Sequence, residues 1–281
     1  MKNAKQIWQE TAKQLEKVYD QRESENISYL LLEDLFQLKR ADILGEREWL
    51  IDERKLSVSI ARLLNHEPIQ YVTGIADFFG YQFFIQKGAL IPRPETEELV
   101  ALIIKENSVA NPRILDVGSG SGCIPIVLKL KLGGEVSGLD ISEEALQVSR
   151  KNAEKLGASV SFSQLDVLKM PLPCNQLDVL VSNPPYIPNK DRQQMAANVL
   201  DYEPEMALFV SNEDPFIFYR RIAQLGLNSL KSGGKLYFEI HERFGSEIVN
   251  LLSGIGYSHV HLFQDMQGKD RMVSATNSTN K

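Results

Sequence analysis

The sequence predicts an α/β protein in which seven strands form a mainly parallel sheet with helices on both faces. Three observations support this prediction. From Asn111 onward, short apolar segments rich in β-branched residues alternate with longer helix-forming segments. The first strand runs into a glycine-rich turn, DVGSGSG, which is typical of the passage from strand to helix in such sheets. The last two strands are joined only by residues 264–270, too few for a helical crossover, so they should pair antiparallel.

The elements of this domain follow one another along residues 93–276, and residues 277–281 form a polar tail that we expect to be frayed. The predicted strands cover residues 113–117, 135–139, 160–164, 177–182, 235–240, 259–263 and 271–275. The predicted helices cover residues 121–131, 142–156, 215–230 and 244–252.

Two smaller regions precede this domain. Residues 1–67 contain no proline and one glycine, Gly45, and their apolar residues recur at helical spacing, which predicts a small helical bundle. Residues 68–92 form a linker. From residue 71 the linker is rich in aromatic and β-branched residues and is interrupted by glycines, which predicts strands joined as a hairpin.

Composition narrows the class of protein. Hydrophobic residues make up 43% of the chain and charged residues 24%, and no apolar run is long enough to span a membrane. The N-terminus lacks the apolar region of a signal peptide, so we expect a cytoplasmic protein without a membrane partner. Cys123 and Cys174 have no metal-binding or redox spacing. A net charge of -6 gives no electrostatic indication of nucleic-acid binding.

Chemistry-bearing residues follow successive predicted strands. The glycines of Gly118-Ser119-Gly120-Ser121-Gly122 allow a tight turn and close approach of a ligand. Asp140 ends the second strand, where a carboxylate can accept hydrogen bonds from both ribose hydroxyls of a nucleoside. Asp166 follows the third strand and could accept from the amine of an adenine, with Val167 beside the ring. Each could alone be a cap or turn residue, but the ordered set indicates a nucleoside site.

The fourth strand ends in Asn183-Pro184-Pro185-Tyr186. Two consecutive prolines stiffen this corner and leave carbonyl oxygens that the following prolyl nitrogens cannot use. Asn183 adds an amide, and Tyr186 adds a flat ring that can stack on a planar group. The corner is therefore suited to hold a planar NH₂ group by both of its protons while its faces stay open to attack.

These motifs resemble those of a known family. Over nearly its whole length the chain resembles the HemK/PrmC-type glutamine methyltransferases, within the class I S-adenosylmethionine-dependent methyltransferases with a Rossmann-like sheet. The matching segments are EPIQYVTG, FFG, LIPRPETEELV, DVGSGSG, NPPYI, YEPEMALF, FYRRI, SGGKLYFEI and GKDRMV. One departure is His241-Glu242-Arg243-Phe244, where the family commonly has a glycine and then a glutamine. We interpret His241 as a solvated loop residue.

The resemblance implies that S-adenosylmethionine is the cofactor and that peptide-chain release factors are the protein partners. The implied cofactor-binding residues are Gly118, Ser119, Gly120, Ser121, Gly122, Asp140, Asp166, Val167 and Asn183. The implied catalytic and substrate-binding residues are Asn183, Pro184, Pro185 and Tyr186, and we add Arg93, which lies between two prolines, as a substrate-binding candidate. We expect a monomer whose helical bundle recognises the substrate protein.

Other readings of the same residues stay open. NPPY also suits an adenine-N6 nucleic-acid methyltransferase, although the acidic composition disfavours it. A binding module without activity would not need the glycine turn, Asp140 and NPPY together. A nicotinamide dehydrogenase would be expected to carry G-x-G-x-x-G, which this chain lacks at the glycine turn. His259 and His261 alternate on a predicted strand, but two histidines without a third ligand do not predict a metal site.

Overall fold

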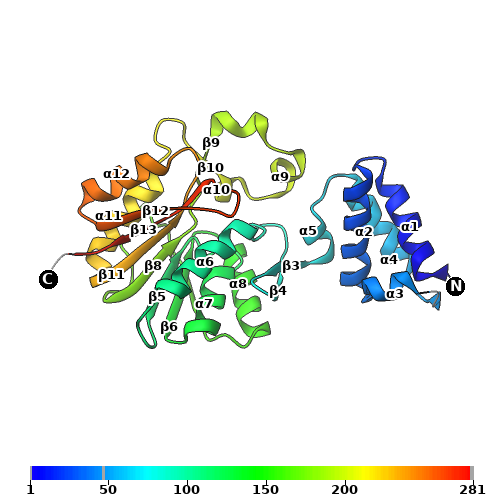
Figure 1. The fold of residues 1–281 in the computed structure, drawn as a ribbon, viewed down its shortest axis with the longest axis horizontal. Coiled ribbons are helices and arrows are strands. Elements are labelled where there is room, and N and C mark those ends of the chain that lie inside the picture. Colours follow the sequence, from blue (N-terminus) through cyan, green and yellow to red (C-terminus); the bar gives the residue numbers. More distant parts are fainter. Residues whose placement is uncertain (1, 46–47, 279–281) are drawn as a thin grey trace. The chain divides into compact units, whose positions relative to one another are not determined.

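The computed structural model describes residues 2–45 and 48–278 and divides into two compact units (Figure 1). The first, which we call unit 1, comprises the chain up to Ile75 together with Ala196–Tyr202. Unit 2 comprises Ala76–Met195 and the chain from Glu203 onward. Among the described residues, no helix combines the length and the apolar character that a membrane span requires.

Unit 1 is a helical bundle, as its sequence predicts. Its elements are β1 (Lys2–Asn3), α1 (Ala4–Leu15), α2 (Gln21–Phe36), α3 (Arg40–Leu44), β2 (Glu48–Trp49), α4 (Glu53–Leu64), α5 (Ile69–Thr73) and α9 (Ala197–Tyr202). Asn3, Asp20 and Asp52 cap α1, α2 and α4 by accepting from backbone N–H groups of the first turn. Leu15, Leu31 and Leu63, which share the apolar stripes, are completely buried in its core.

The segment 69–73 is helical, and the prediction of strand from residue 71 is wrong there. Pro68 precedes the helix and suits a helix start, and Gly74 ends it with a left-handed φ of 78°. The Arg62 guanidinium donates to the carbonyls of Tyr71 and Val72 near the end of this short helix. The hairpin follows as predicted, in β3 (Ile75–Phe78) and β4 (Tyr81–Phe84).

Unit 2 contains the seven-stranded sheet. Its strands are β5 (Arg113–Val117), β6 (Glu135–Asp140), β7 (Ser161–Gln164), β8 (Leu177–Ser182), β11 (Leu230–Glu239), β12 (Ser258–Gln264) and β13 (Asp270–Thr276). They lie in the order β12-β13-β11-β8-β5-β6-β7. The strands β11, β8, β5, β6 and β7 are parallel to one another, whereas β13 is antiparallel to both β11 and β12. This confirms the predicted antiparallel ending.

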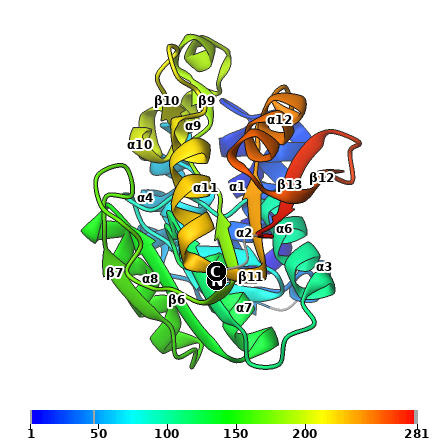
Figure 2. The same ribbon diagram turned by 90° about the vertical axis from the view of Figure 1, so that its left-hand side faces the viewer.

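Helices cover both faces of this sheet (Figure 2). The helices α6 (Pro94–Glu106), α7 (Cys123–Leu132) and α8 (Glu143–Lys155) pack with the β3–β4 hairpin in one buried apolar cluster. The helices α11 (Ile217–Ser229) and α12 (Gly245–Ile255) pack in the other cluster. All six residues of β8 are buried, as expected of a central strand covered on both faces.

Three local features differ from the sequence prediction. β11 begins at Leu230, five residues early, because the register shifts between Leu230 and Lys235, and Gly233 there has a φ of 81°. β12 also shifts register after Ser258, and His259 has a φ of 46°, so regular alternation does not hold at the histidines. Between β8 and α11 lie short elements that were not predicted, namely β9 (Ile187–Pro188), the 3₁₀ helix η1 (Asn189–Gln194), α9, α10 (Glu205–Leu208) and β10 (Phe209–Val210).

Candidate active site

A cavity of about 350 Å³ lies at the carboxyl ends of β5, β6 and β8. The chain leaves β5 toward β6 on one side, whereas β8 lies on the other, so the cavity lies at the point where the strand order reverses. Of the residues selected from the sequence, its lining includes Arg93, Gly118, Ser119, Gly120, Ser121, Asp140, Asp166, Val167, Asn183, Pro184 and Pro185. Gly122 and Tyr186 do not line it.

The glycine turn closes against the end of β6. The backbone N–H groups of Gly118 and Ser119 both donate to Leu139 O, at 2.7 and 2.9 Å. Gly118 and Gly120 have φ values of 79° and 54°, a region that favours glycine. Gly122 serves packing, because a Cβ there would lie 3.0 to 3.2 Å from the side chains of Ile126, Ser149 and Phe162.

Asp140 links the turn to the start of α8. Its Oδ2 accepts from Gly120 N at 2.8 Å, and its Oδ1 accepts from Ser142 N at 2.9 Å. Burial raises the pKa of this carboxyl, and these backbone hydrogen bonds oppose the rise. The two backbone hydrogen bonds hold the carboxylate in place. Each of its oxygens keeps a further lone pair, so the carboxylate can still accept from two ligand hydroxyls.

Asp116, at the end of β5, is a polar residue of this region that was not selected from the sequence. It is completely buried, and within the described chain neither carboxylate oxygen has a hydrogen-bond partner. The Ser119 hydroxyl, which belongs to a cavity-lining residue, is likewise unpaired. Burial, and secondarily the charge of Asp140, raises the pKa of Asp116 well above its ordinary range. The signal in the sequence was its position two residues before the first glycine of the turn.

These unpaired groups fit a ligand that brings a positive charge. A buried carboxylate without a partner is costly, and a cationic donor bound at the glycine turn would reduce that cost. The sulfonium and ammonium groups of S-adenosylmethionine are such charges, and Asp140 suits its ribose. The residues present therefore fit this cofactor.

Asp166 is more exposed than the other acidic residues of the site. Lys169 lies 2.9 Å from its Oδ2, and Leu168 N donates to its Oδ1 at 3.0 Å. The hydrogen bond from Lys169 lowers the pKa of Asp166. Both Asp166 and its neighbour Val167 line the cavity, and Val167 is buried.

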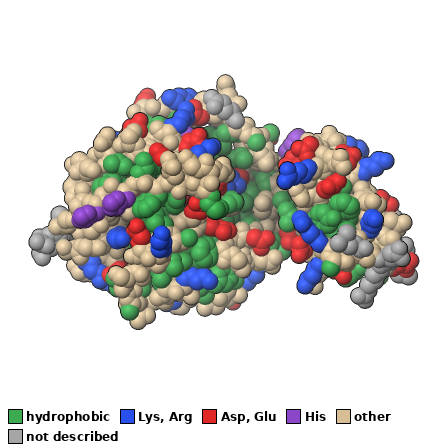
Figure 3. Space-filling view, viewed as in Figure 1, with side chains coloured by type: hydrophobic (Ala, Val, Ile, Leu, Met, Phe, Trp, Pro, Cys, Tyr) green, Lys and Arg blue, Asp and Glu red, His purple; other side chains and the backbone are tan. Residues whose placement is uncertain are grey.

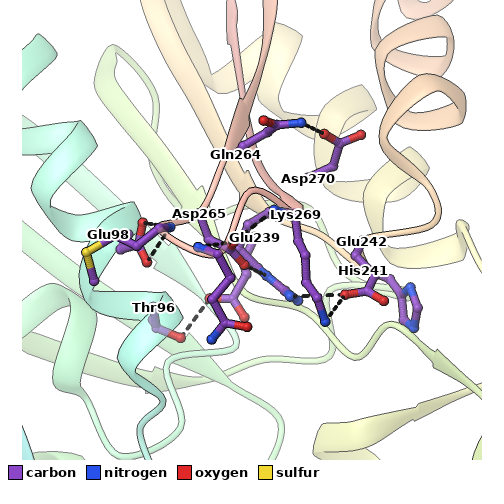
Figure 4. Close-up of polar contacts among 12 residues, drawn as sticks. Thr96, Glu98, Glu239, His241, Glu242, Gln264, Asp265, Lys269 and Asp270 are labelled. Atoms are coloured by element: carbon purple, nitrogen blue, oxygen red, sulfur yellow. Dashed lines mark hydrogen bonds and ion pairs between the residues drawn. The ribbon is translucent and has the colours of Figure 1, made fainter.

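The NPPY corner is tied to two other elements by hydrogen bonds. Asn183 Nδ2 lies 3.3 Å from Thr96 Oγ1 in the first turn of α6. Thr96 Oγ1 lies 2.7 Å from Glu239 Oε2 at the end of β11 (Figure 4), and Tyr186 Oη lies 3.2 Å from Glu239 Oε1. Thr96 and Glu239 were not selected from the sequence, where capping accounted for the acidic start of α6. The Tyr186 ring packs edge-on against His241, with centroids 6.0 Å apart.

His241 lies in the loop after β11, as interpreted, but its side chain is half-buried and therefore only partly solvated. Besides Tyr186 it contacts Phe244, with ring centroids 5.2 Å apart, and its Nδ1 accepts from Arg243 N at 3.2 Å. Burial lowers its pKa, which favours the neutral ring. His241 therefore supports the Tyr186 ring from outside the cavity.

Arg93 lines the cavity and is paired with Glu203. Its Nη2 lies 2.5 Å from Glu203 Oε1, and the Glu203 side chain is only 1% exposed. Ile91 N also donates to Glu203, at 3.4 Å. The pair joins the IPRP and YEPE segments, which gives Arg93 a structural role beside any contact with substrate.

Comparison with known proteins places these features in a family. Residues 6–74 match the family model described as PrmC N-terminal domain, and residues 108–269 match a methyltransferase domain. A release factor glutamine methyltransferase of Bacteroides thetaiotaomicron is 45% identical over 93% of this chain and 95% of its own length. Another, from Flavobacterium psychrophilum, is 40% identical over 92% of this chain and 94% of its own length.

Solved structures share the fold. A methyltransferase from Pyrococcus furiosus superposes with a TM-score of 0.55 at 17% identity, covering 79% of this chain and 100% of that one. A ribosomal protein L11 methylase from Lactobacillus delbrueckii subsp. bulgaricus gives a TM-score of 0.50 at 21% identity, covering 72% of this chain and 90% of that one. At these identities the likeness concerns the fold, which is that of class I methyltransferases.

Proposed function

This chain belongs to the release factor glutamine methyltransferases, and on that basis we propose that it transfers a methyl group from S-adenosylmethionine to the side-chain amide nitrogen (N5) of a glutamine in peptide-chain release factors, which supports translation termination. One observation supports this chemistry above the others. The NPPY corner and the glycine turn border the same cavity, so an amide held at the corner would meet a cofactor held at the turn.

The residues that would hold the cofactor are those that line this cavity, with Gly122 shaping the turn from behind. The backbone of 118–121 would follow the amino-acid portion, Asp140 would accept from the ribose, and Asp166 with Val167 would hold the adenine. Asp116, which is buried behind the lining, would act on positive charge at the turn through space, and the Ser119 hydroxyl, which is unpaired, could hydrogen-bond to the cofactor. When bound, S-adenosylmethionine supplies an electrophilic methyl group on a sulfonium.

The substrate amide needs help because its nitrogen lone pair is shared with its carbonyl. Asn183 Oδ1 and the carbonyl of Pro184 would accept the two N–H protons and stabilise positive charge that develops on nitrogen. No strong base is required, since the proton becomes acidic once the nitrogen carries the methyl group. The remaining contribution is orientation, which can be worth about 7 to 11 kcal/mol in well-positioned reactions.

The partner is a folded protein, for which we propose recognition by unit 1. We further infer a cytoplasmic monomer that does not bind nucleic acid directly. The net charge of -6 supports the last point. On the face drawn in Figure 3, Lys and Arg side chains are interspersed with Asp and Glu instead of forming a basic patch.

The deciding experiment measures transfer of label from methyl-labelled S-adenosylmethionine. The acceptors are a purified release factor, the same factor with its candidate glutamine changed to asparagine, and duplex DNA. We expect label on the intact factor alone. Label on DNA and none on protein would instead establish the adenine-N6 activity and overturn the proposal.

A further inference from the structure

Glu239 forms a buried polar cluster behind the cavity wall. Its carboxylate is 1% exposed and does not line the cavity, whereas its partner Thr96 and the next residue in the chain of contacts, Asn183, both do. The contacts run from Glu239 Oε2 to Thr96 Oγ1 at 2.7 Å and from Thr96 Oγ1 to Asn183 Nδ2 at 3.3 Å. Glu239, which does not line the cavity, is thus linked to the cavity residue Asn183 by hydrogen bonds through the Thr96 hydroxyl.

The chemistry of these groups fixes the direction of each hydrogen bond. When Glu239 is ionised its carboxylate can only accept, so the single proton of the Thr96 hydroxyl is donated to Glu239. The hydroxyl can then only accept from Asn183, which turns the NH₂ group of that amide toward Thr96. The opposite end of the amide, Oδ1, receives no hydrogen bond from a described residue and keeps its acceptor capacity.

We propose that Glu239 is a positioning residue which, through Thr96, sets the orientation of the Asn183 amide so that Oδ1 is presented to the substrate. The inference rests on the proposed function and adds to it a device that selects a donor NH₂ group as substrate. Without an acceptor behind Thr96, its hydroxyl could donate to Asn183 Oδ1 and turn the NH₂ group toward the cavity. Two NH₂ groups would then face each other.

The groups around Glu239 influence its protonation, on which the orientation of the Asn183 amide depends. Burial raises its pKa, while the hydrogen bond from Thr96, the charge of Arg271 and the hydrogen bond from Tyr186 oppose the rise. The titratable or charged groups around it are Arg271 on β13, Tyr186 after β8, Glu95 on α6, Tyr219 on α11 and Cys123 on α7. Arg271 is itself held by Asp265, 3.1 Å from its Nε. Protonation of Glu239 at low pH would let the carboxyl donate to Thr96 and remove the fixed direction.

The main test replaces Glu239 by Gln, which keeps the shape but can donate as well as accept. We expect kcat for release factor methylation to fall about 10- to 100-fold, as for misplacement of a reacting group, while the Kd for S-adenosylmethionine stays within about twofold. In Thr96→Val, which removes the hydroxyl, kcat should fall by a similar factor. In Thr96→Ser, which keeps the hydroxyl, kcat should stay close to the wild-type value. The double variant Glu239→Gln/Thr96→Val should lose no more than either single variant, because both interrupt one path.

A matched control lies on the same two elements. Tyr237 Oη on β11 donates to Glu106 Oε2 on α6 at 2.9 Å, a second hydroxyl-to-carboxylate contact, and neither residue lines the cavity. Tyr237→Phe should therefore destabilise the fold without lowering kcat of the folded enzyme.

The dependence of kcat on pH provides a second measurement. The acid-side fall of kcat in the wild type should be lost in Glu239→Gln.

Three outcomes would overturn the proposal: a folded Glu239→Gln enzyme with wild-type kcat and pH profile, equal losses in Glu239→Gln and Tyr237→Phe, or additive losses in the double variant. A wild type inactive toward release factors would refute the proposed function. An active wild type with an equally active Glu239→Gln variant would refute only the positioning role.

Discussion

At the residue scale, variants of the Arg93–Glu203 ion pair can show whether Arg93 only stabilises the fold or also binds substrate. Arg93→Met should lower the free energy of unfolding by about 1–3 kcal/mol, because the buried Glu203 carboxylate loses its charge partner, although Arg93 itself is 34% exposed and Ile91 N still donates to Glu203. Adding Glu203→Gln should recover most of that loss. Urea unfolding and methylation of the release factor would be measured on both variants. If the stable double variant methylates normally, Arg93 has no part in binding substrate.

Asp116 makes the stability of the ligand-free enzyme depend on pH. Its folded-state pKa is raised, so its contribution to stability is full below the unfolded pKa and is lost as pH rises through the folded pKa. Asp140 and Glu239 act in the same direction. Asp116→Asn should therefore flatten, without abolishing, the fall of the melting temperature as pH rises above the unfolded pKa of about 4. It should also reduce the stabilisation that S-adenosylmethionine gives; an unchanged ligand-induced shift would exclude Asp116 from cofactor binding.

At the scale of secondary-structure elements, two helical glycines should respond oppositely to alanine. A Cβ on Gly226 of α11 would meet Tyr257 Oη and would lie 2.9 Å from Leu180 Cδ2, so Gly226→Ala should cost about 1–3 kcal/mol of unfolding free energy. Gly254 of α12 is exposed with nothing within 4 Å, and Gly254→Ala should add about 0.4–1 kcal/mol. Denaturant unfolding of the two variants checks both signs. A neutral Gly226→Ala would show that α11 can move away from β8.

A comparison of predicted and observed element boundaries shows which elements local sequence patterns can predict. The strands β5 and β8 were predicted residue for residue, because central parallel strands form continuous apolar runs with clear ends. α5 was missed because its stabilising contacts come from Arg62, whose link with Tyr71 and Val72 no local pattern displays. The short elements of residues 187–210 were missed for a similar reason. Phe209 pairs with Ile187, and Tyr202 donates to Asn65 O at 2.7 Å, far away in sequence.

At the scale of the whole molecule, unit 1 is proposed to recognise the release factor. Removing residues 1–74 should lower kcat/KM for the intact factor by about 10- to 100-fold, since binding energy remote from the reacting amide would be lost. Methylation of a short glutamine peptide should change little. Thermal unfolding and cofactor binding would verify that the remaining unit is folded. Equal rates on the intact factor with and without residues 1–74 would rule out this role for the N-terminal part of unit 1.

The sequence alone determined the sheet, its antiparallel ending, the helical N-terminal region, the glycine turn with Asp140, and the NPPY corner. These features depend on periodicity, glycine and proline conformations, and the fact that parallel strands bring their carboxyl ends together. Only the tertiary structure decided the partners of those residues. Glu239 is 143 residues from Thr96, and Glu203 is 110 residues from Arg93. Burial, which makes such pairs necessary, arises only when distant segments pack together, so no local pattern could have specified them.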